Sequence, residues 1–348
     1  RFIGEGLIGH VLDPLFENYW SPLMMKLSGL LGHGSFLHDL LVGSLLDGQI
    51  DFGQSMGILT TGLYVPFAMV LPYVFAFYLV LSILEDVGYL PRLGVLMDTM
   101  MHRLGLHGLA IIPMLLGLGC NVPGALATRI CESKRQRYIA GVLMAICVPC
   151  MAQTAMVIGL LGRYGAAGLA PVFGTLAVVW VVLALAFKHL MPGESPEIFL
   201  EIPPYRFPSV RALAQKIWLR VRLFVAEAVP FVLLGVLIIN LLYSLRVLQL
   251  FERIFSPVLT TVFGLPPKAI ASLLIGFLRK DVAVGMLAPL GLSLKQLIIA
   301  CVVLSVYFPC VATFAVLVRE FGMKGMLKAT GIMVLVAFTV GGLLNLVL

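Results

Sequence analysis

The chain contains long, uninterrupted runs of apolar residues, and these runs decide what it can fold into. A helix that crosses the hydrocarbon core of a bilayer needs about 20 consecutive apolar residues. A membrane barrel instead uses strands of about 10 residues in which apolar and polar positions alternate. The runs here are continuous, so we predict an all-α, polytopic integral membrane protein. The predicted membrane segments are 60–84, 106–128, 138–161, 166–189, 224–245, 268–290, 294–318 and 325–347.

Composition also indicates that lipid is the solvent. Hydrophobic residues make up 60% and charged residues 12% of the 348 residues, whereas soluble domains average about 45–50% and about 25%. A water-soluble chain with a mean hydropathy of +1.04 would expose large apolar patches and aggregate. The net charge is +7, and the cations lie in loops between apolar segments, which is typical of membrane topology. We therefore expect the lipid bilayer as a partner and no nucleic acid.

Three of the six cysteines lie where the sequence disrupts a helix. Cys120 follows a Gly-rich stretch, and Cys150 and Cys310 each follow a proline, which frees a backbone carbonyl one turn earlier. Thiolates bind soft or borderline metals such as Fe(II), Zn(II) and Cu(I) rather than Mg(II) or Ca(II), and Asn121 would add a neutral oxygen. These three cysteines are candidate metal contacts. The alternative is that they are small packing residues between helices.

A charged cluster lies inside one of the apolar segments. Arg279, Lys280 and Asp281 occupy the middle of that segment, where a charge costs at least about 2.5–3.5 kcal/mol on insertion scales. The functional interpretation is a gate element with Asp281 as its anionic member. The alternative is an internally neutralised cluster that stabilises packing.

No motif of an enzyme stands out in the sequence. It has no phosphate-binding Gly-rich loop followed by Lys-Ser or Lys-Thr, no Ser/His/Asp arrangement and no H-E-x-x-H. We therefore expect neither catalysis nor a resident cofactor in this chain.

The chain divides into four expected parts. These are an interfacial or extramembrane segment (1–59), a first membrane repeat (60–190), a linker with an amphipathic basic helix (191–222) and a second membrane repeat (223–348). Polar residues of the first part are interpreted as solvated surface, with transient metal contacts as the alternative: His10, His33, His38, Asp39, Asp47 and Asp51. The sequence starts with Arg rather than Met, and we expect a fragment or a processed product.

Four short stretches recur about 160 residues later in the chain. Leu106–Gly117 aligns without gaps with Leu265–Gly276. The other matches are Pro149–Ala152 with Pro309–Ala312, Tyr164–Gly168 with Phe321–Gly325, and Val65–Phe67 with Val229–Phe231. One such match could be a coincidence, but four at nearly one offset indicate a duplicated membrane unit, which is a common plan of transporters.

Loop charges indicate that the two repeats are inverted. The loops at 134–137 and 319–328 are rich in cations and should be cytoplasmic. The first-repeat counterpart of the second loop lies near Arg163, has one cation, and should lie outside. Eight full crossings cannot produce this arrangement, so at least one segment does not cross. The Gly/Pro-rich segment 106–128 and the charged segment 268–290 are expected to be broken or re-entrant.

Several motifs resemble those of the ferrous iron transporter B family, over about residues 47–348. The family patterns LEDxGYxxR…MD, LPPYRxPxxR, GFxxKExxxG and YxPCxAT each have a counterpart here. The matching stretches are Leu84–Asp98, Ile202–Arg211, Gly276–Gly285 and Tyr307–Thr313, and Gly105–Pro123 with Ala127–Arg129 continues the likeness. The resemblance implies a membrane domain with two gate-type repeats that passes Fe(II) inward.

The resemblance also implies functional residues. The path cysteines proposed for the family match Cys120, Cys150 and Cys310. The remaining gate or path candidates are Asn121, Glu85, Asp86, Lys280, Asp281 and Thr313. The family usually has Gly/Ser-Ala-Arg-Leu-Pro after the cysteine that matches Cys150, whereas this chain has Met-Ala-Gln-Thr-Ala at 151–155. The missing Arg and Pro bear on the role of Cys150 and on metal selectivity.

The family further implies partners and a location. Its members couple an N-terminal cytoplasmic GTP-binding domain to the membrane domain; that domain and the first membrane span are not in this sequence, so we do not expect GTP binding. We expect Fe(II) as substrate, the missing domain, a homo-oligomer and a small cytoplasmic accessory protein as partners, and the plasma membrane of a prokaryote as location. Alternatives are a permease for an organic solute such as a nucleoside, a transporter of Zn(II) or Mn(II), and a membrane scaffold without conduction.

Overall fold

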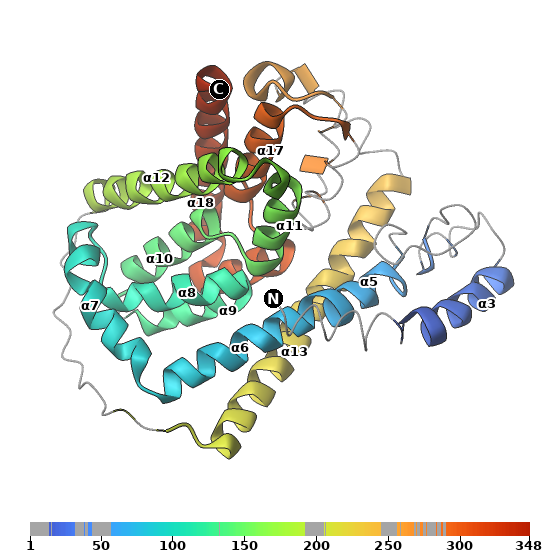
Figure 1. Cartoon of the computed structure of the whole chain (residues 1–348), viewed down its shortest axis with the longest axis horizontal. Coiled ribbons are helices and arrows are strands. Elements are labelled where there is room, and N and C mark those ends of the chain that lie inside the picture. The colour runs from blue at the N-terminus through green and yellow to red at the C-terminus, as the bar shows by residue number, and fades with distance from the viewer. Residues whose placement is uncertain are drawn as a thin grey trace. The chain divides into compact units, whose positions relative to one another are not determined.

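The structure, a computed structural model, shows helices joined by turns (Figure 1). It describes residues 14, 16–31, 38, 41–43, 57–131, 133–191, 205, 207–244, 256–257, 259–267, 269, 272–273, 276, 283, 287 and 290–348. Within these ranges no β-strand occurs, which confirms the predicted all-α class. The chain divides into two compact units, Arg1–Val80 with Ala214–Arg253, and Leu81–Leu213 with Ile254–Leu348.

The first unit contains the early helices and most of one long helix. Its elements are η2 (Phe16–Trp20), α3 (Ser21–Leu31), α5 (Thr61–Tyr64), the π-helix η3 (Val65–Val70), the start of α6 (Leu71–Asp86) and most of α13 (Val210–Ser244). The guanidinium carbon of Arg220 on α13 lies 5.5 Å from the ring centre of Tyr78 on α6, so the two helices are in contact in this unit.

A small core ties together the start of the first unit. Met24 and Val42 are buried and pack with neighbouring apolar side chains. The Thr60 hydroxyl donates to the carbonyl of Val42 at 2.8 Å. His38 is also buried. Its Nε2 lies 2.8 Å from the Ser28 hydroxyl, so the buried ring has a hydrogen-bond partner. The interpretation of His38 as solvated surface is therefore wrong, and the other five polar residues of that group lie outside the described residues.

The second unit contains most of the described helices of the two predicted repeats. Its elements are the end of α6, α7 (Tyr89–Arg103), η4 (Gly108–Ala110), α8 (Ile111–Gly119), α9 (Asn121–Ala127), η5 (Thr128–Ile130), α10 (Lys134–Cys147), α11 (Met151–Leu161), η6 (Gly162–Tyr164), α12 (Ala166–Leu190), α17 (Leu294–Val306) and α18 (Val311–Val347). Every residue of 139–147 on α10 and of 297–306 on α17 is buried. Since α10 packs against α12, α17 and α18, both repeats share one core.

The Gly/Pro-rich segment 106–128 forms a helical hairpin. The backbone of Cys120 is extended (φ −150°, ψ 134°) and separates α8 from α9. A Cβ on Gly124 would lie 2.9 Å from the backbone nitrogen of Gly117, seven residues earlier, so α9 folds back onto α8. The predicted break in this segment is confirmed. Most of segment 268–290 lies outside the described residues.

A buried side chain of the following helix packs against the small residues of this hairpin, and a related contact occurs at Gly276 in the second repeat. Met144 on α10 fills the space next to Gly117 and Gly124, with its Sδ 2.4 Å from where a Cβ of Gly124 would lie. In the second repeat, a Cβ on Gly276 would meet Leu304 of α17 at 2.5 Å and the Cβ of Ala283 at 3.1 Å. Small residues seven apart therefore face a buried side chain of the next helix in each repeat.

The two repeats also begin their central helix in the same way. α10 follows Ser133, whose hydroxyl accepts a hydrogen bond from the backbone nitrogen of Gln136 at 3.1 Å. α17 follows Ser293, whose hydroxyl accepts from the backbone nitrogen of Gln296 at 3.3 Å, while the Gln296 side chain accepts from the Ser293 nitrogen at 3.2 Å. Ser followed three residues later by Gln is the capping-box pattern. This pair, 160 residues apart, supports the predicted duplication.

Both central helices end at their Pro-Cys pair. The backbone of Cys150 (φ −70°, ψ 166°) and of Cys310 (φ −61°, ψ 156°) is extended, and α11 and α18 start at the next residue. Each of the predicted segments 138–161 and 294–318 is therefore divided into two helices at its Pro-Cys pair. Proline has no N–H to donate and disfavours a helical residue before it, so each helix stops there.

The helix after each Pro-Cys pair then turns at a glycine with a positive φ. Gly165 (φ 60°) lies between η6 and α12, and Gly322 (φ 71°) forms a kink inside α18. A side chain would strain the backbone in this region of φ, which favours glycine. The predicted match of 164–168 with 321–325 is thus supported by a shared backbone conformation.

These two turns lie at opposite ends of the second unit. The carbonyl of Met191, just after α12, accepts a hydrogen bond from Arg135 at 2.5 Å. α12 has 25 residues and is therefore about 37 Å long at 1.5 Å per residue. Gly165, at the start of α12, thus lies far from Met191 and Arg135. The kink in α18 instead follows Glu320, which pairs with Arg129 in η5, just before α10, the helix whose Arg135 bonds to Met191. This arrangement supports the inverted repeat.

Two described stretches are long and apolar enough to cross a membrane, Ala166–Leu190 and Leu294–Val347. Helices Val74–Asp86 and Tyr89–Arg103 meet that criterion only together, with a bend of 82° between them. α12 leaves aliphatic side chains such as Val178 and Val182 exposed, as a lipid-facing helix would. The protein is a polytopic helical membrane protein, and the number of eight segments stays a prediction.

Candidate functional site

Three cysteines occupy equivalent positions, each immediately before a helix. Cys120 precedes α9, Cys150 precedes α11 and Cys310 precedes α18, and all three have an extended backbone. The three sulfurs therefore lie at breaks of the helical backbone rather than inside continuous helices.

The same three cysteines lie near one another. Cys120 interacts electrostatically with both Cys310 and Cys150, so the hairpin of the first repeat brings its sulfur to the breaks of both repeats. These three thiols are partly exposed, whereas Cys131, Cys147 and Cys301 are buried. The prediction that three sulfurs gather at the repeat interface is consistent with this geometry, and the buried cysteines fill the core.

Oxygen atoms accompany the sulfurs. The Thr313 hydroxyl lies 3.1 Å from Cys310 Sγ, one helical turn into α18. Asn121 follows Cys120 directly, and its Oδ1 is buried without a hydrogen-bond partner. The structure thus places two of the candidates named from the sequence, Asn121 and Thr313, next to candidate cysteines.

Sequence reasoning did not single out Gln153, a buried polar residue on the helix that follows Cys150. Its Nε2 donates to the hydroxyl of Ser305 on α17 at 2.7 Å, which links the repeats, and its Oε1 is buried without a partner. Gln153 stands three residues after Cys150, as Thr313 stands three residues after Cys310. The repeat alignment contained this signal.

The donor set suits a passing ion rather than a fixed one. Within the described ranges, no three His, Cys, Asp or Glu side chains converge tightly enough to hold a metal ion. Sulfur ligands favour soft or borderline metals over Mg(II) or Ca(II), which oxygen donors alone would suit. A conducting site must bind weakly enough to release its ion, and a donor set with few charges meets that requirement.

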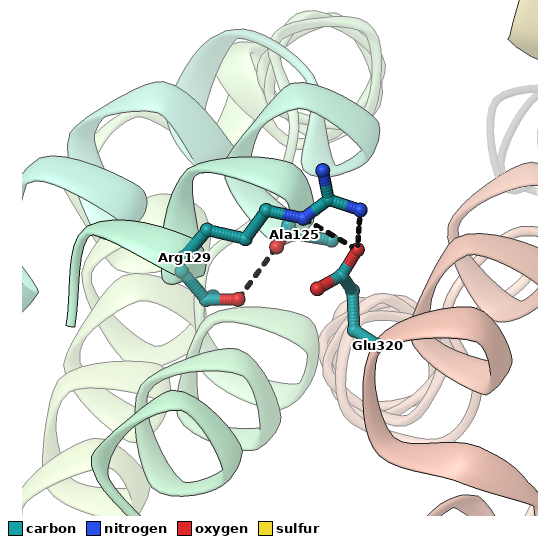
Figure 2. A network of polar contacts seen from close by, with 4 residues as sticks. Ala125, Arg129 and Glu320 are labelled. Atoms are coloured by element: carbon teal, nitrogen blue, oxygen red, sulfur yellow. Dashed lines mark hydrogen bonds and ion pairs between the residues drawn. The ribbon is translucent and has the colours of Figure 1, made fainter. Parts of the chain in front are cut away.

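A polar contact behind the hairpin joins the two repeats (Figure 2). Arg129 donates to a single carboxylate oxygen of Glu320, from Nε at 2.9 Å and from Nη2 at 2.5 Å. The Thr128 hydroxyl donates to the carbonyl of Ala125 at 2.7 Å and closes the end of α9. The element that carries Cys120 is thereby tied to the helix that starts after Cys310.

Comparison with known proteins agrees with this architecture. Residues 67–164 and 225–324 each match a gate family described as "Nucleoside recognition", and residues 172–220 match a family described as "Ferrous iron transport protein B C terminus". The two gate matches cover more than half of the chain and coincide with the two repeats. The chain belongs to the ferrous iron transport protein B family.

Relatives with the name Fe(2+) transporter FeoB align along much of the chain. The protein from Synechocystis is 28% identical over 301 residues, which are 76% of this chain and 48% of the relative. The protein from Methanocaldococcus jannaschii is 26% identical over 350 residues, 90% of this chain and 52% of the relative. A Porphyromonas gingivalis protein named as a fusion of Fe(2+) transport protein A with FeoB is 35% identical over 175 residues, 49% of this chain and 20% of the relative. The chain spans about half the length of the first two relatives and less of the fusion protein.

The acidic candidates of this FeoB-family chain lie at the bend after α6. Glu85 and Asp86 form the end of α6 and are half-buried. Gly88, with a φ of 86°, starts the next helix. Their role in a path stays a prediction. Lys280 and Asp281 lie outside the described residues.

Another FeoB-like motif has a structural role at the entrance to the hairpin. Asp98 Oδ1 accepts a hydrogen bond from the Gly108 nitrogen at 2.7 Å and lies 3.2 Å from Nδ1 of His107 and 3.3 Å from Nδ1 of His102. A Cβ on Gly108 would lie 2.1 Å from the carbonyl oxygen of Gly94. The Asp98 carboxylate therefore fastens α7 to η4 at a point where only glycine fits.

Proposed function

We propose that this membrane domain conducts ferrous iron along the three cysteine-bearing helix breaks. The observation that carries the proposal is the electrostatic interaction of Cys120 with Cys150 and Cys310, which supports breaks from both repeats lying near one another. The names of the relatives support Fe(II) as the substrate. The thiol and neutral-oxygen donors suit a borderline divalent cation.

The helix breaks account for how an ion can pass through an apolar core. Carbonyls at the end of a helix have no partner inside that helix, so the ends of α10 and α17 offer oxygens in addition to the thiols. A thiol that binds the cation releases its proton, which offsets the added charge. The proton returns when the ion moves on. Because each break contributes one sulfur, the ion meets several weak contacts rather than one tight cage.

The proposal extends to the surroundings of the domain. We place it in the plasma membrane of a prokaryote, joined to a cytoplasmic GTP-binding domain and able to form a homo-oligomer. The name of the Porphyromonas gingivalis relative, which includes Fe(2+) transport protein A, supports a small accessory protein as a further partner. The domain itself acts as a transporter and not as an enzyme.

Fe(II) uptake into liposomes tests the proposal. The chain is reconstituted with an Fe(II)-quenched dye inside, and the parent is compared with Cys120→Ser and Cys310→Ser. Each change should lower the flux by about tenfold or more, since a lost ligand weakens metal binding by such factors. Cys301→Ser is the matched control, because Cys301 is buried in α17. Equal flux in the parent and both variants would overturn the cysteine path.

Metal binding provides a readout that does not depend on opening of the gate. Co(II) added to the purified chain in detergent should give sulfur-to-metal charge-transfer absorption. The absorption should fall in Cys120→Ser and Cys310→Ser and persist in Cys301→Ser. If uridine uptake occurs instead and is insensitive to these changes, the permease alternative is correct and the iron proposal is wrong.

A further inference from the structure

We propose that Gln153 is a direct oxygen ligand of the divalent cation in transit and that Ser305 positions it. The inference rests on the proposed cysteine path and adds a specificity-determining residue to it. Gln153 lies in the stretch 151–155, where this sequence departs from the usual family pattern, and it places a neutral amide three residues after Cys150.

The hydrogen bonds around Ser305 fix which way the Gln153 amide points. The Ser305 hydroxyl donates its proton to the carbonyl of Cys301 at 2.8 Å. Its oxygen is then available to accept, and it accepts from Gln153 Nε2 at 2.7 Å. The reversed amide would place two acceptors against each other. The oxygen of Gln153 therefore points away from Ser305.

That oxygen accepts no hydrogen bond. Gln153 is 1% exposed, and its Oε1 is buried without a hydrogen-bond partner. A buried amide oxygen that has lost water without gaining a donor is unfavourable. A cation that passes the site satisfies the oxygen, so the orphaned atom is accounted for by a ligand that comes and goes.

The position of Gln153 in the chain places it in the first turn of the helix that follows Cys150. Residues three apart on a helix share a face, so Gln153 lies on the same face of α11 as the cysteine that precedes the helix. Thr313 has the equivalent position in the second repeat, and its hydroxyl touches Cys310 at 3.1 Å. Asn121, which follows Cys120, also has a buried amide oxygen, Oδ1, without a hydrogen-bond partner. Each of the three cysteines is thus accompanied by one neutral oxygen group.

The path thus offers a sulfur and a neighbouring neutral oxygen group at each break, and this combination selects by chemical class. Carbonyl-type oxygens suit harder ions such as Mn(II), whereas soft ions such as Cu(I) prefer sulfur alone. Replacing the oxygen of Gln153 with sulfur should therefore shift the preference towards softer ions without changing the size of the side chain much.

Co(II) and Cd(II) titrations of the purified full chain test this assignment. Gln153→Met removes the oxygen and retains a long, unbranched side chain, and we expect Co(II) affinity to fall about tenfold with Cd(II) affinity unchanged or increased. Ser305→Ala removes the hydrogen bond that orients the amide, so Co(II) affinity should fall by about tenfold, as is typical when a group that positions a metal ligand is lost. Cys301→Ser, a change at a buried cysteine of the same helix, is the control and should leave Co(II) affinity unchanged. Gln153→Glu should raise Co(II) affinity and make it fall as the carboxylate is protonated. This second variant keeps the test informative if Gln153→Met does not fold.

The outcomes separate this inference from the function on which it rests. If Gln153→Met and Gln153→Glu bind Co(II) like the parent while Cys120→Ser does not, the ligand role of Gln153 is overturned and the cysteine path stands. If Cys120→Ser also binds like the parent, both are overturned. A fall in Co(II) affinity that is matched by an equal fall for Cd(II) would make Gln153 a structural residue and overturn the ligand assignment.

Discussion

Arg129 and Glu320 lie 191 residues apart in sequence, yet two nitrogens of the Arg129 guanidinium donate to one carboxylate oxygen of Glu320. Arg129 follows the hairpin of the first repeat, and Glu320 precedes the kink of α18 in the second. Arg129 is 64% exposed and Glu320 is 9% exposed. The pair therefore joins the two repeats at the edge of their shared core, with the acid as the buried partner.

Loss of the arginine should destabilise the domain by about 1 kcal/mol, because the exposed guanidinium is partly screened by solvent. Arg129→Ala should lower the thermal midpoint measured by circular dichroism in detergent, and Glu320→Gln should lower it by a similar amount. In the double variant the two effects should be clearly less than additive, as expected for residues in contact. Strict additivity would show that the contact contributes nothing to stability.

The hairpin should not tolerate a methyl group on its inner face. In Gly124→Ala the new carbon would lie 2.4 Å from Met144 Sδ and 2.9 Å from the backbone nitrogen of Gly117. The sulfur can move and the backbone cannot, so we expect a loss of about 1–3 kcal/mol. Trimming Met144 to alanine in the same chain should not restore stability. Gly174→Ala on α12, where nothing lies within 4 Å, is the control and should be neutral or slightly stabilising.

The repeat architecture was predictable because local patterns repeat. Apolar runs predicted helices, and the offset of about 160 residues correctly paired the turns at Gly165 and Gly322. Hydropathy did not reveal that the Pro-Cys pairs end their helices, since valine and phenylalanine before a proline are as apolar as a continuing helix. Contacts such as Gln153 with Ser305 were not predictable, because they join residues 152 positions apart and leave no local pattern.

The paired glycine turns yield a prediction about backbone conformation alone. Gly165 and Gly322 have φ values of 60° and 71°, and a Cβ at either position would meet nothing within 4 Å. Their ψ values are −140° and 166°, a region of positive φ that is essentially restricted to glycine, so Gly165→Ala and Gly322→Ala should each cost about 1–3 kcal/mol without a clash with neighbouring atoms. Asn tolerates positive φ only near the left-handed helical conformation, so Gly322→Asn should not recover the loss. Thermal midpoints in Gly165→Ala and Gly322→Ala equal to that of the parent would contradict the assigned turns.

Cys131 should make the stability of the domain depend on alkaline pH. It lies in the connection between η5 and α10, and burial raises its pKa from the ordinary 9.0 to about 11, against the opposing effect of Arg137. The folded state therefore keeps the thiol proton that the unfolded chain loses, so stability is full below pH 9 and falls as pH rises towards 11. Two pKa units correspond to a loss on the order of 2 kcal/mol. Thermal midpoints between pH 8 and 10.5 should decline less steeply in Cys131→Ala than in the parent, and parallel declines would assign the pH dependence to other groups.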